Sequence, residues 1–203
     1  MEARLGRSFF ERYTPFVARD LLGCTIVRIL DGIRMAGEIV EAEAYRGKRD
    51  PASHAYVGKT PRNAVMFGEP GHAYIYFTYG FHHMLNFATE SEGTPGAVLI
   101  RAIHPTEGES AMKANRGAGA PSGVTDGPGK LTKALKIDRD FNGEDLVTSE
   151  RLFVERGRAP KEFGTSSRVG IREGAGYRWR FYVKGDAFVS KGRPTPSKPR
   201  THN

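Results

Sequence analysis

The sequence predicts one globular domain in which a few short helices accompany antiparallel β-hairpins. Apolar residues follow helical spacing near the N-terminus, whereas several later runs alternate as strands do and are separated by tight-turn residues such as Asp31-Gly32. The chain has 203 residues, of which 38% are hydrophobic, and its composition shows no break, so it can form a core of its own. We expect a single domain over residues 1–190 and a basic, proline-rich, disordered tail over residues 191–203.

Composition excludes several classes of protein. The apolar runs are too short to cross a membrane, and residues 1–7 lack the apolar core of a signal peptide, so we expect an intracellular protein without a membrane partner. Cys24 is the single cysteine, which excludes disulfides, zinc fingers and iron–sulfur clusters formed within one chain. The net charge of +8 favours a polyanionic partner such as nucleic acid, but a merely soluble basic protein fits the charge equally well.

The first part of the chain is expected to form a helix that leads into a hairpin. Thr14-Pro15 provides a capping hydroxyl followed by a proline in the first turn, and Gly23 is a natural helix end. Residues 24–30 and 33–45 then form two strands on either side of a tight turn.

The second of these strands carries two carboxylates. Because strand side chains alternate in direction, Ile39, Glu41, Glu43 and Tyr45 are expected on one face. The solvent-facing side of an ordinary structural strand would show the same pattern. Whether these two glutamates are structural or catalytic must therefore be judged from the other segments of the chain.

Spacing alone leaves a second enzymatic interpretation open. Same-face neighbours on a strand lie about 7 Å apart, so Glu41 and Glu43 have the spacing of an acid–base pair in an inverting glycoside hydrolase. Such pairs normally flank the bond from opposite sides, and a protein with a net charge of +8 has no reason to favour a neutral sugar. We rank this alternative low and expect Glu41 to pair with a basic neighbour.

A loop follows, with a short helical turn that begins at Asp50-Pro51 and holds His54. Residues 72–79 and 81–89 then form two strands hinged at a glycine, which places Tyr79 near the tip of a hairpin. In a basic protein a tyrosine at such a tip is a candidate for insertion into nucleic acid, although packing onto its own core is the commoner fate.

Residues 97–103 form another strand, with Arg101 inside an apolar run. An unpaired buried guanidinium is very costly, so Arg101 should face a carboxylate or a phosphate. Residues 127–135 have a glycine-rich entry to a helix, whose N–H groups suit a DNA phosphate as well as they suit an ordinary loop-to-helix junction. Further elements are expected as a helix over 107–116 and as strands near 152–154 and 180–183.

Together these segments closely resemble the alkyladenine (3-methyladenine) DNA glycosylase family of mammals and many bacteria, in order from about residue 8 to residue 190. The segments that carry the resemblance are Ala18 to Gly23, Ile39 to Tyr45, Asp50 to His54, Thr60 to Asn63, Met66-Phe67, Tyr74 to Gly80, Val98 to Ala102, Gly127 to Leu131, Arg168 to Gly170 and Arg180 to Val183. The long N-terminal extension of the mammalian proteins has no counterpart here, from which we expect a bacterial, cytoplasmic protein, or a nuclear one if the source is eukaryotic.

The resemblance implies an α+β fold, a single compact domain around a curved antiparallel sheet, with a protruding hairpin at Tyr79-Gly80 that inserts into the DNA minor groove. It implies a monofunctional glycosylase that flips alkylated or deaminated purines out of duplex DNA and hydrolyses the N-glycosidic bond with an activated water. The partner would be double-stranded DNA with damaged purines. No cofactor and no metal are implied, and we expect a monomer.

The resemblance also implies roles for individual residues. Tyr45, His54 and Tyr76 match the residues that sandwich the extruded base, and Asn86 matches the one that crowds the exocyclic amine of guanine. Tyr79 would fill the gap left in the duplex. We further expect contacts to the DNA backbone from Arg62, Gly129 and Lys130.

For the chemical step, Glu43 matches the general base, while Arg101 and the backbone carbonyl of Val169 would hold the attacking water. Neutral hypoxanthine requires help at the purine as it leaves, and the sequence does not show the donor. A non-catalytic DNA-binding protein that grips DNA through Tyr79 and the basic loops is the alternative from a different class.

Overall fold

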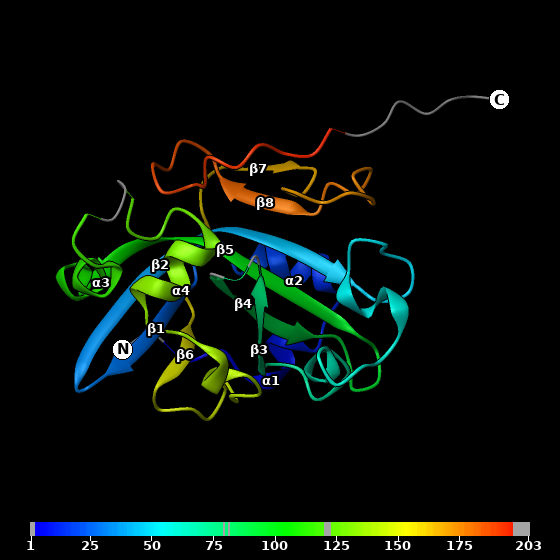
Figure 1. Ribbon diagram of the computed structural model, residues 1–203, viewed down its shortest axis with the longest axis horizontal. Coiled ribbons are helices and arrows are strands. Elements are labelled where there is room, and N and C mark those ends of the chain that lie inside the picture. Colours follow the sequence, from blue (N-terminus) through cyan, green and yellow to red (C-terminus); the bar gives the residue numbers. More distant parts are fainter. Residues whose placement is uncertain (1–2, 79, 81, 120–122, 197–203) are drawn as a thin grey trace.

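The computed structural model describes residues 3–78, 80, 82–119 and 123–196, and within them all eight strands join one antiparallel sheet. The strands are β1 (Thr25–Leu30), β2 (Ile33–Arg46), β3 (Ala73–Thr78), β4 (His82–Thr89), β5 (Gly96–Glu107), β6 (Leu152–Glu155), β7 (Phe163–Ser166) and β8 (Arg180–Val183). The main path through the sheet runs β3-β4-β5-β2-β1-β6, and the β7–β8 pair joins it at β2. Figure 1 shows the sheet curling across the molecule.

The long strand β2 is the hub of this sheet. One of its edges pairs with β5 along almost its whole length, while its other edge is shared by two strands in succession. β1 covers the first half of that edge, and β8 pairs with residues 41 to 43 in the second half. The two glutamates of β2 therefore lie between β5 on one side and β8 on the other.

The alternation along β2 is interrupted in its middle. The register with β5 shifts around Ile39 and Glu41, which marks a β-bulge. As a result Ile39 belongs to the same buried apolar core as Ala42 and Ala44, and the prediction that Ile39 shares a face with Glu41 and Glu43 was wrong. Alternation holds on both sides of the bulge, but the bulge changes which positions face this core.

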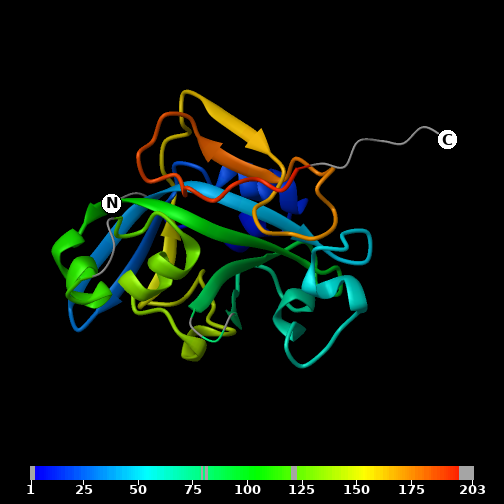
Figure 2. The ribbon, with the colours of Figure 1, turned by 45° about the horizontal axis from the view of Figure 1, so that its top comes forward.

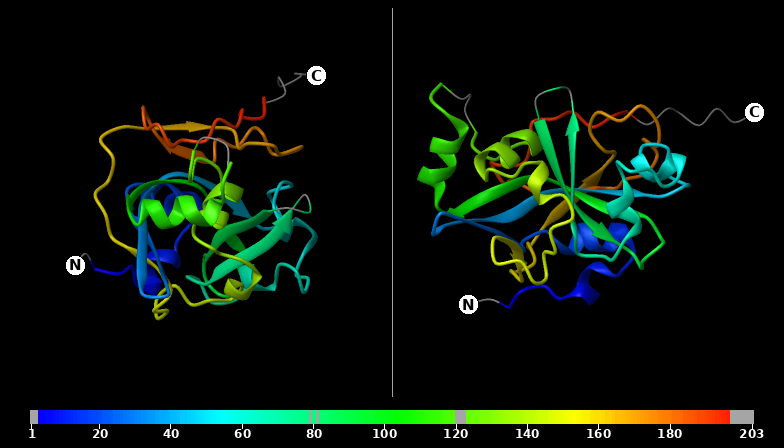
Figure 3. Two further views of the ribbon diagram at one scale, coloured as in Figure 1. Left: turned by 60° about the vertical axis from the view of Figure 1, so that its left-hand side comes forward. Right: turned by 60° about the horizontal axis from the view of Figure 1, so that its bottom comes forward.

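Short helices complete the domain: α1 (Arg7–Phe10), α2 (Thr14–Asp20), α3 (Glu109–Arg116) and α4 (Pro128–Ala134), with 3-10 turns η1 (His54–Val57), η2 (Ala64–Phe67) and η3 (Arg139–Phe141). α2 packs against β2 and β5, and α4 packs against β4 and β5. Figure 3 shows β3 and β4 side by side near α4. The fold is thus an α+β domain with a curled sheet, as the sequence predicts. Tyr79, and with it the tip expected to insert into DNA, lies outside the described residues.

Two local predictions need correction. Thr14 is the first residue of α2 rather than its cap, and its Oγ1 instead donates a hydrogen bond to Glu90 Oε1 at 2.7 Å. The strand through Arg101 is longer than expected, because β5 continues to Glu107 and α3 begins only at Glu109.

Residues 191–196 of the C-terminal segment run along the domain, and two of them make backbone contacts with it. Val169 forms an isolated β-bridge with Pro194, and the N–H of Thr195 donates to the carbonyl of Arg168 at 3.0 Å. Gly192 lies so close to Val169 that an added Cβ would come within 2.8 Å of its side chain. Figure 2 shows this red segment running beside the β7–β8 hairpin. Residues 197–203 lie outside the described residues.

A buried ion pair ties the loop after β2 to the segment before β8. Both nitrogens at the tip of Arg168 donate to Asp50, at 2.6 and 2.7 Å, and both side chains are fully buried. Arg168 also donates to the carbonyl of Ala44 at 2.9 Å. Two loops far apart in the sequence are therefore held against the end of β2.

Among the helices of the described residues, none is long and apolar enough to span a membrane.

Removal of Asp50 should be strongly destabilising. Asp50→Ala leaves the Arg168 guanidinium buried without its carboxylate, which typically costs about 3–5 kcal/mol. We expect that loss in the free energy of unfolding from urea titration. Glu162→Ala is the matched control, because it breaks the exposed pair with Lys184 and should cost less than about 1 kcal/mol. Equal effects of the two substitutions would contradict this account of the buried pair.

Candidate active site

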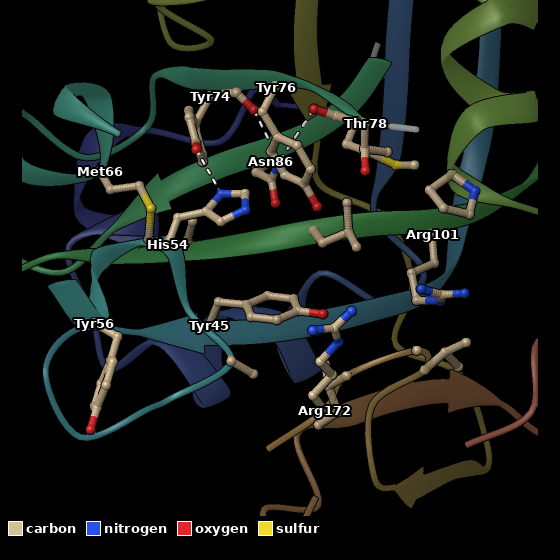
Figure 4. Close-up of a pocket in the computed structure, with 18 of the residues that line it drawn as sticks. Tyr45, His54, Tyr56, Met66, Tyr74, Tyr76, Thr78, Asn86, Arg101 and Arg172 are labelled. Carbon is tan, nitrogen blue, oxygen red and sulfur yellow. Dashed lines mark hydrogen bonds between the residues drawn. The ribbon is translucent and has the colours of Figure 1, made fainter. Parts of the chain in front are cut away.

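A cavity of about 680 Å³ opens beside β2, β3 and β5, a size suited to a small organic ligand. Its lining comes from six parts of the chain: β2, the loop with η1, η2, the β3–β4–β5 part of the sheet, the start of α4, and the loop after Arg168. The lining side chains include Tyr45, His54, Tyr56, Met66, Tyr74, Tyr76, Thr78, Asn86, Leu99, Arg101, Val169 and Arg172. Figure 4 shows these side chains converging on the cavity.

Three aromatic rings form opposite walls of the cavity. Figure 4 shows Tyr45 on one side, with His54 and Tyr76 on the other. The rings of His54 and Tyr76 meet edge to face, with centroids 4.5 Å apart, and His54 Nδ1 lies 2.8 Å from the Tyr74 hydroxyl. The structure thus brings together the three residues that the sequence assigned to base binding. Aromatic rings on two sides of a cavity can stack on a flat aromatic ligand.

Burial sets the protonation of these rings. Desolvation, followed by the charge of Arg62, lowers the pKa of His54, so its ring is neutral at pH 7. Burial raises the pKa of Tyr45 well above its ordinary value, and the charge of Glu43 raises it further. Burial likewise raises the pKa of Tyr76. The walls of the cavity are therefore uncharged.

Glu43 is fully buried behind the lining of the cavity, in contact with three residues that line it. Its Oε2 accepts a hydrogen bond from the Tyr45 hydroxyl at 2.8 Å and a longer one from Arg101 Nη1 at 3.4 Å. Its Oε1 accepts from the backbone N–H of Val169 at 2.8 Å. The sequence predicted a contribution from the Val169 carbonyl, whereas the contact seen here is made by its N–H. Three donors thus fix the orientation of this carboxylate.

Glu41 has a different environment, although it is equally buried. Its Oε1 accepts from Arg101 Nε at 2.9 Å, from Arg180 Nε at 2.6 Å and from Ser190 Oγ at 3.0 Å. Its Oε2 accepts from the backbone N–H of Ser190 at 2.7 Å. Both predictions for this pair of side chains are confirmed, since Glu41 pairs with basic neighbours and Arg101 faces carboxylates. Glu41 is saturated with structural contacts, which argues against a Glu41/Glu43 acid–base pair.

Arg101 connects the two carboxylates. Burial alone would lower its pKa, but the charges of Glu43 and Glu41 raise it above the usual value, so the guanidinium stays charged. Sequence reasoning missed two partners in this cluster. Arg180 stands in an apolar run just as Arg101 does, so the same argument applied to it, whereas nothing in the sequence marks Ser190.

Asn86 lies on β4, buried at the back of the cavity. Its Nδ2 donates to the backbone carbonyls of Tyr74 at 3.1 Å and Met84 at 3.2 Å. The side chain is therefore held firmly by the β-hairpin while it lines the pocket. A rigid side chain at this place can exclude a ligand with an extra substituent.

The residues predicted to contact the DNA backbone are in three different situations. Arg62 is exposed, with its guanidinium 5.8 Å from the centre of the Tyr76 ring. Lys130 forms an ion pair with Asp126 at 2.8 Å. Gly129 is buried against His82. Tyr79 lies outside the described residues, and the structure groups no three potential metal ligands in the parts of the chain that it describes.

A cavity with aromatic walls and a buried carboxylate behind its lining is consistent with an enzyme that hydrolyses N-glycosyl bonds in nucleic acids. The comparison with known proteins then gives the family. Residues 8–187 match the model of the methylpurine-DNA glycosylase family, and the chain belongs to this family of DNA-repair hydrolases.

Bacterial and archaeal relatives agree with this assignment and cover nearly the whole chain. A protein of Chlorobium phaeovibrioides is 46% identical over 194 residues, which is 95% of this chain and 99% of the relative. One from Methanocella arvoryzae is 49% identical over 194 residues, covering 94% and 97%. Both bear the name "Putative 3-methyladenine DNA glycosylase". The resemblance noted in the sequence is confirmed at the level of the family.

The structural role of Glu41 can be tested by measuring the stability of a variant. Glu41→Gln removes the charge that faces both Arg101 and Arg180, and the loss of one partner from a buried ionic cluster should cost about 3–5 kcal/mol in the free energy of unfolding. Glu107→Gln, which alters an exposed pair with Arg34, serves as the control and should cost less than about 1 kcal/mol. A Glu41→Gln protein with native stability but no base release would assign Glu41 to the chemistry instead.

Proposed function

We propose that this protein is a monofunctional DNA glycosylase that flips alkylated or deaminated purines out of duplex DNA and starts base excision repair. Its proposed substrates are 3-methyladenine, 7-methylguanine, hypoxanthine and ethenoadenine. The observation that carries this proposal is the buried Glu43, held by three donors that themselves line a cavity with aromatic walls. The family assignment supports a DNA substrate.

The depth of Glu43 supports the flipping step. Its side chain has no exposed surface, so a purine stacked inside duplex DNA could not approach it. A base that leaves the stack can enter the cavity between Tyr45 and the opposite rings of His54 and Tyr76. Stacking on such walls contributes about 1–3 kcal/mol per base and tolerates different purines.

The proposed hydrolysis places a water between Glu43 and the sugar. As the C1′–N9 bond breaks, its electron pair moves to the purine, and the water oxygen bonds to C1′ while its proton passes to Glu43. The carboxylate also stabilises the positive charge that develops on the sugar. Arg101 and the Val169 carbonyl are proposed to hold the water. Because none of the described residues that line the cavity is a lysine, water is the proposed nucleophile and an abasic site the product.

The remaining proposed roles concern discrimination between bases and contacts with DNA. Asn86, clamped to the backbone of its own hairpin, is proposed to reject guanine by crowding its exocyclic amine. Arg62 and Lys130 are proposed to contact DNA phosphates, and Tyr79 to fill the gap left by the extruded base. We propose that the protein acts as a monomer in the bacterial cytoplasm.

The role of Glu43 is tested by Glu43→Gln, which keeps the shape of the side chain and removes its basicity. Base release from a duplex with one deoxyinosine should fall by roughly 10²–10⁴-fold, the usual contribution of a general base. Binding to the same duplex should persist. A glutamine variant with wild-type release would rule out Glu43 as the base. Tight binding by the wild type with no release from any damaged duplex would favour the non-catalytic alternative.

The proposed phosphate contact of Arg62 is tested by the salt dependence of binding. Arg62→Ala should lower the slope of log K against log salt concentration by about 1, because one fewer counterion is released when DNA binds. Lys161→Ala, another exposed cationic residue that does not line the cavity, is the control and should leave the slope unchanged. An unaltered slope in Arg62→Ala would exclude the contact.

A further inference from the structure

Arg172 is a charged residue of the cavity that the mechanism above does not use. It lines the cavity from the loop after Val169, and Figure 4 shows its side chain rising from that loop toward Tyr45. The residue is exposed, and its guanidinium makes no hydrogen bond or ion pair with any other residue in the described ranges. A guanidinium carries five N–H donors and stays charged at neutral pH, so these donors are available to a ligand.

The loop that carries Arg172 is fixed on both sides. The N–H of Val169 donates to Glu43 at 2.8 Å, and the carbonyl of Ile171 accepts from Thr195 Oγ1 at 3.2 Å. The Gly174 carbonyl accepts a weaker hydrogen bond from the buried guanidinium of Arg168 at 3.5 Å. The backbone of Arg172 is therefore anchored, and its position relative to Glu43 is set by the fold.

The buried charges beside the cavity cancel one another. Glu41 and Glu43 stand against Arg101 and Arg180, and the second buried ion pair, beneath Tyr45, is neutral in itself. The cavity thus has no surplus of buried negative charge that would attract a cationic base.

The rim of the cavity carries the charges that remain. Arg172 is one of them, and Glu173 beside it is also exposed and forms no ion pair with it. Arg62 adds a second guanidinium outside the Tyr76 wall.

The other hydrogen-bond donors of the cavity are neutral or occupied. The lowered pKa of His54 keeps its ring uncharged, and the raised pKa of Tyr76 makes its hydroxyl a poor acid. The amide nitrogen of Asn86 is already bonded to two backbone carbonyls. Both Arg101 and Arg172 line the cavity. Arg101 is held by carboxylates, whereas the N–H groups of Arg172 have no hydrogen-bond partner among the described residues.

We infer that Arg172 is a specificity-determining residue that binds the departing purine and favours the release of neutral damaged purines over cationic methylated ones. This inference rests on the proposed glycosylase function. When the C1′–N9 bond of a hypoxanthine nucleotide breaks, the electron pair leaves the purine as an anion, and the guanidinium donates hydrogen bonds to that anion. The purine takes up its proton from solvent after release, because arginine does not give one up at neutral pH.

A cationic purine gains nothing from the same contact. 7-Methylguanine carries its positive charge before the bond breaks and leaves as a neutral base, so it needs no anion stabilisation. In the bound state the guanidinium and the positive charge of this purine repel each other. One residue therefore acts in opposite directions on the two classes of substrate.

The test compares Arg172→Ala with the wild type on two duplexes, one with a single deoxyinosine and one with a single 7-methylguanine, by single-turnover base release at fixed salt. We expect hypoxanthine release to fall roughly 10- to 100-fold, the worth of a hydrogen bond to a charged group. Release of 7-methylguanine should be unchanged or faster. Arg172→Lys keeps the charge without the planar fork and should restore part of the hypoxanthine rate. Arg158→Ala, which removes an exposed arginine outside the cavity, should affect neither rate.

Each other outcome counts against the inference. Equal loss on both duplexes in Arg172→Ala would show a general contact with DNA, and unchanged rates on both would show no role. Wild-type release of 7-methylguanine without any release of hypoxanthine would contradict the proposed preference. Failure of the wild type to release either base is a different result, because it would refute the proposed function itself.

Discussion

A cluster of opposite charges, buried where β2, β5 and β8 meet, sets the geometry of the whole site. Glu41 and Glu43 come from the central strand, Arg101 from one neighbouring strand and Arg180 from the other. Burying any one of these groups alone would be very unfavourable, so the three strands are stable together only in the register that pairs them. The same register brings Glu43 against Tyr45, Arg101 and Val169, three residues that line the cavity. The stability of the sheet and the position of the proposed base therefore depend on the same contacts.

The two glutamates differ in their hydrogen-bond partners. Glu41 accepts four hydrogen bonds from three residues and holds Arg101 in place, whereas Glu43 accepts three and borders the cavity through Tyr45. Two carboxylates and two guanidiniums can be buried together inside the sheet because their charges balance. The bulge in β2 contributes as well, because it places Ile39 in the apolar core while the next two acidic residues meet the arginines.

Much of this arrangement could be read from the sequence before the structure was known. The strands, the pairing of Arg101 with carboxylates, and the gathering of Tyr45, His54 and Tyr76 follow from alternation, from the cost of a buried charge and from family resemblance. The face of β2 on which Ile39 lies could not be predicted. A bulge depends on how two strands pair, and the residue pattern of one strand does not show it. Nor could the Asp50–Arg168 pair, whose members are separated by 118 residues and carry no local signal of each other. The role of the Val169 N–H escaped prediction for a similar reason, since a backbone donor has no side-chain signature.

The contact between Ser190 and Glu41 has a consequence for how the protein is made. Glu41 leaves the ribosome 149 residues before the serine whose backbone and hydroxyl complete its hydrogen bonds. A nascent chain that has not yet reached Ser190 can pair β1 with β2 and can already contain β8, but its Glu41 carboxylate lacks two of its four donors. The buried charges at the centre of the sheet are therefore fully paired only after Ser190 has been made. A chain that stops before this serine leaves Glu41 short of donors in the middle of its own sheet.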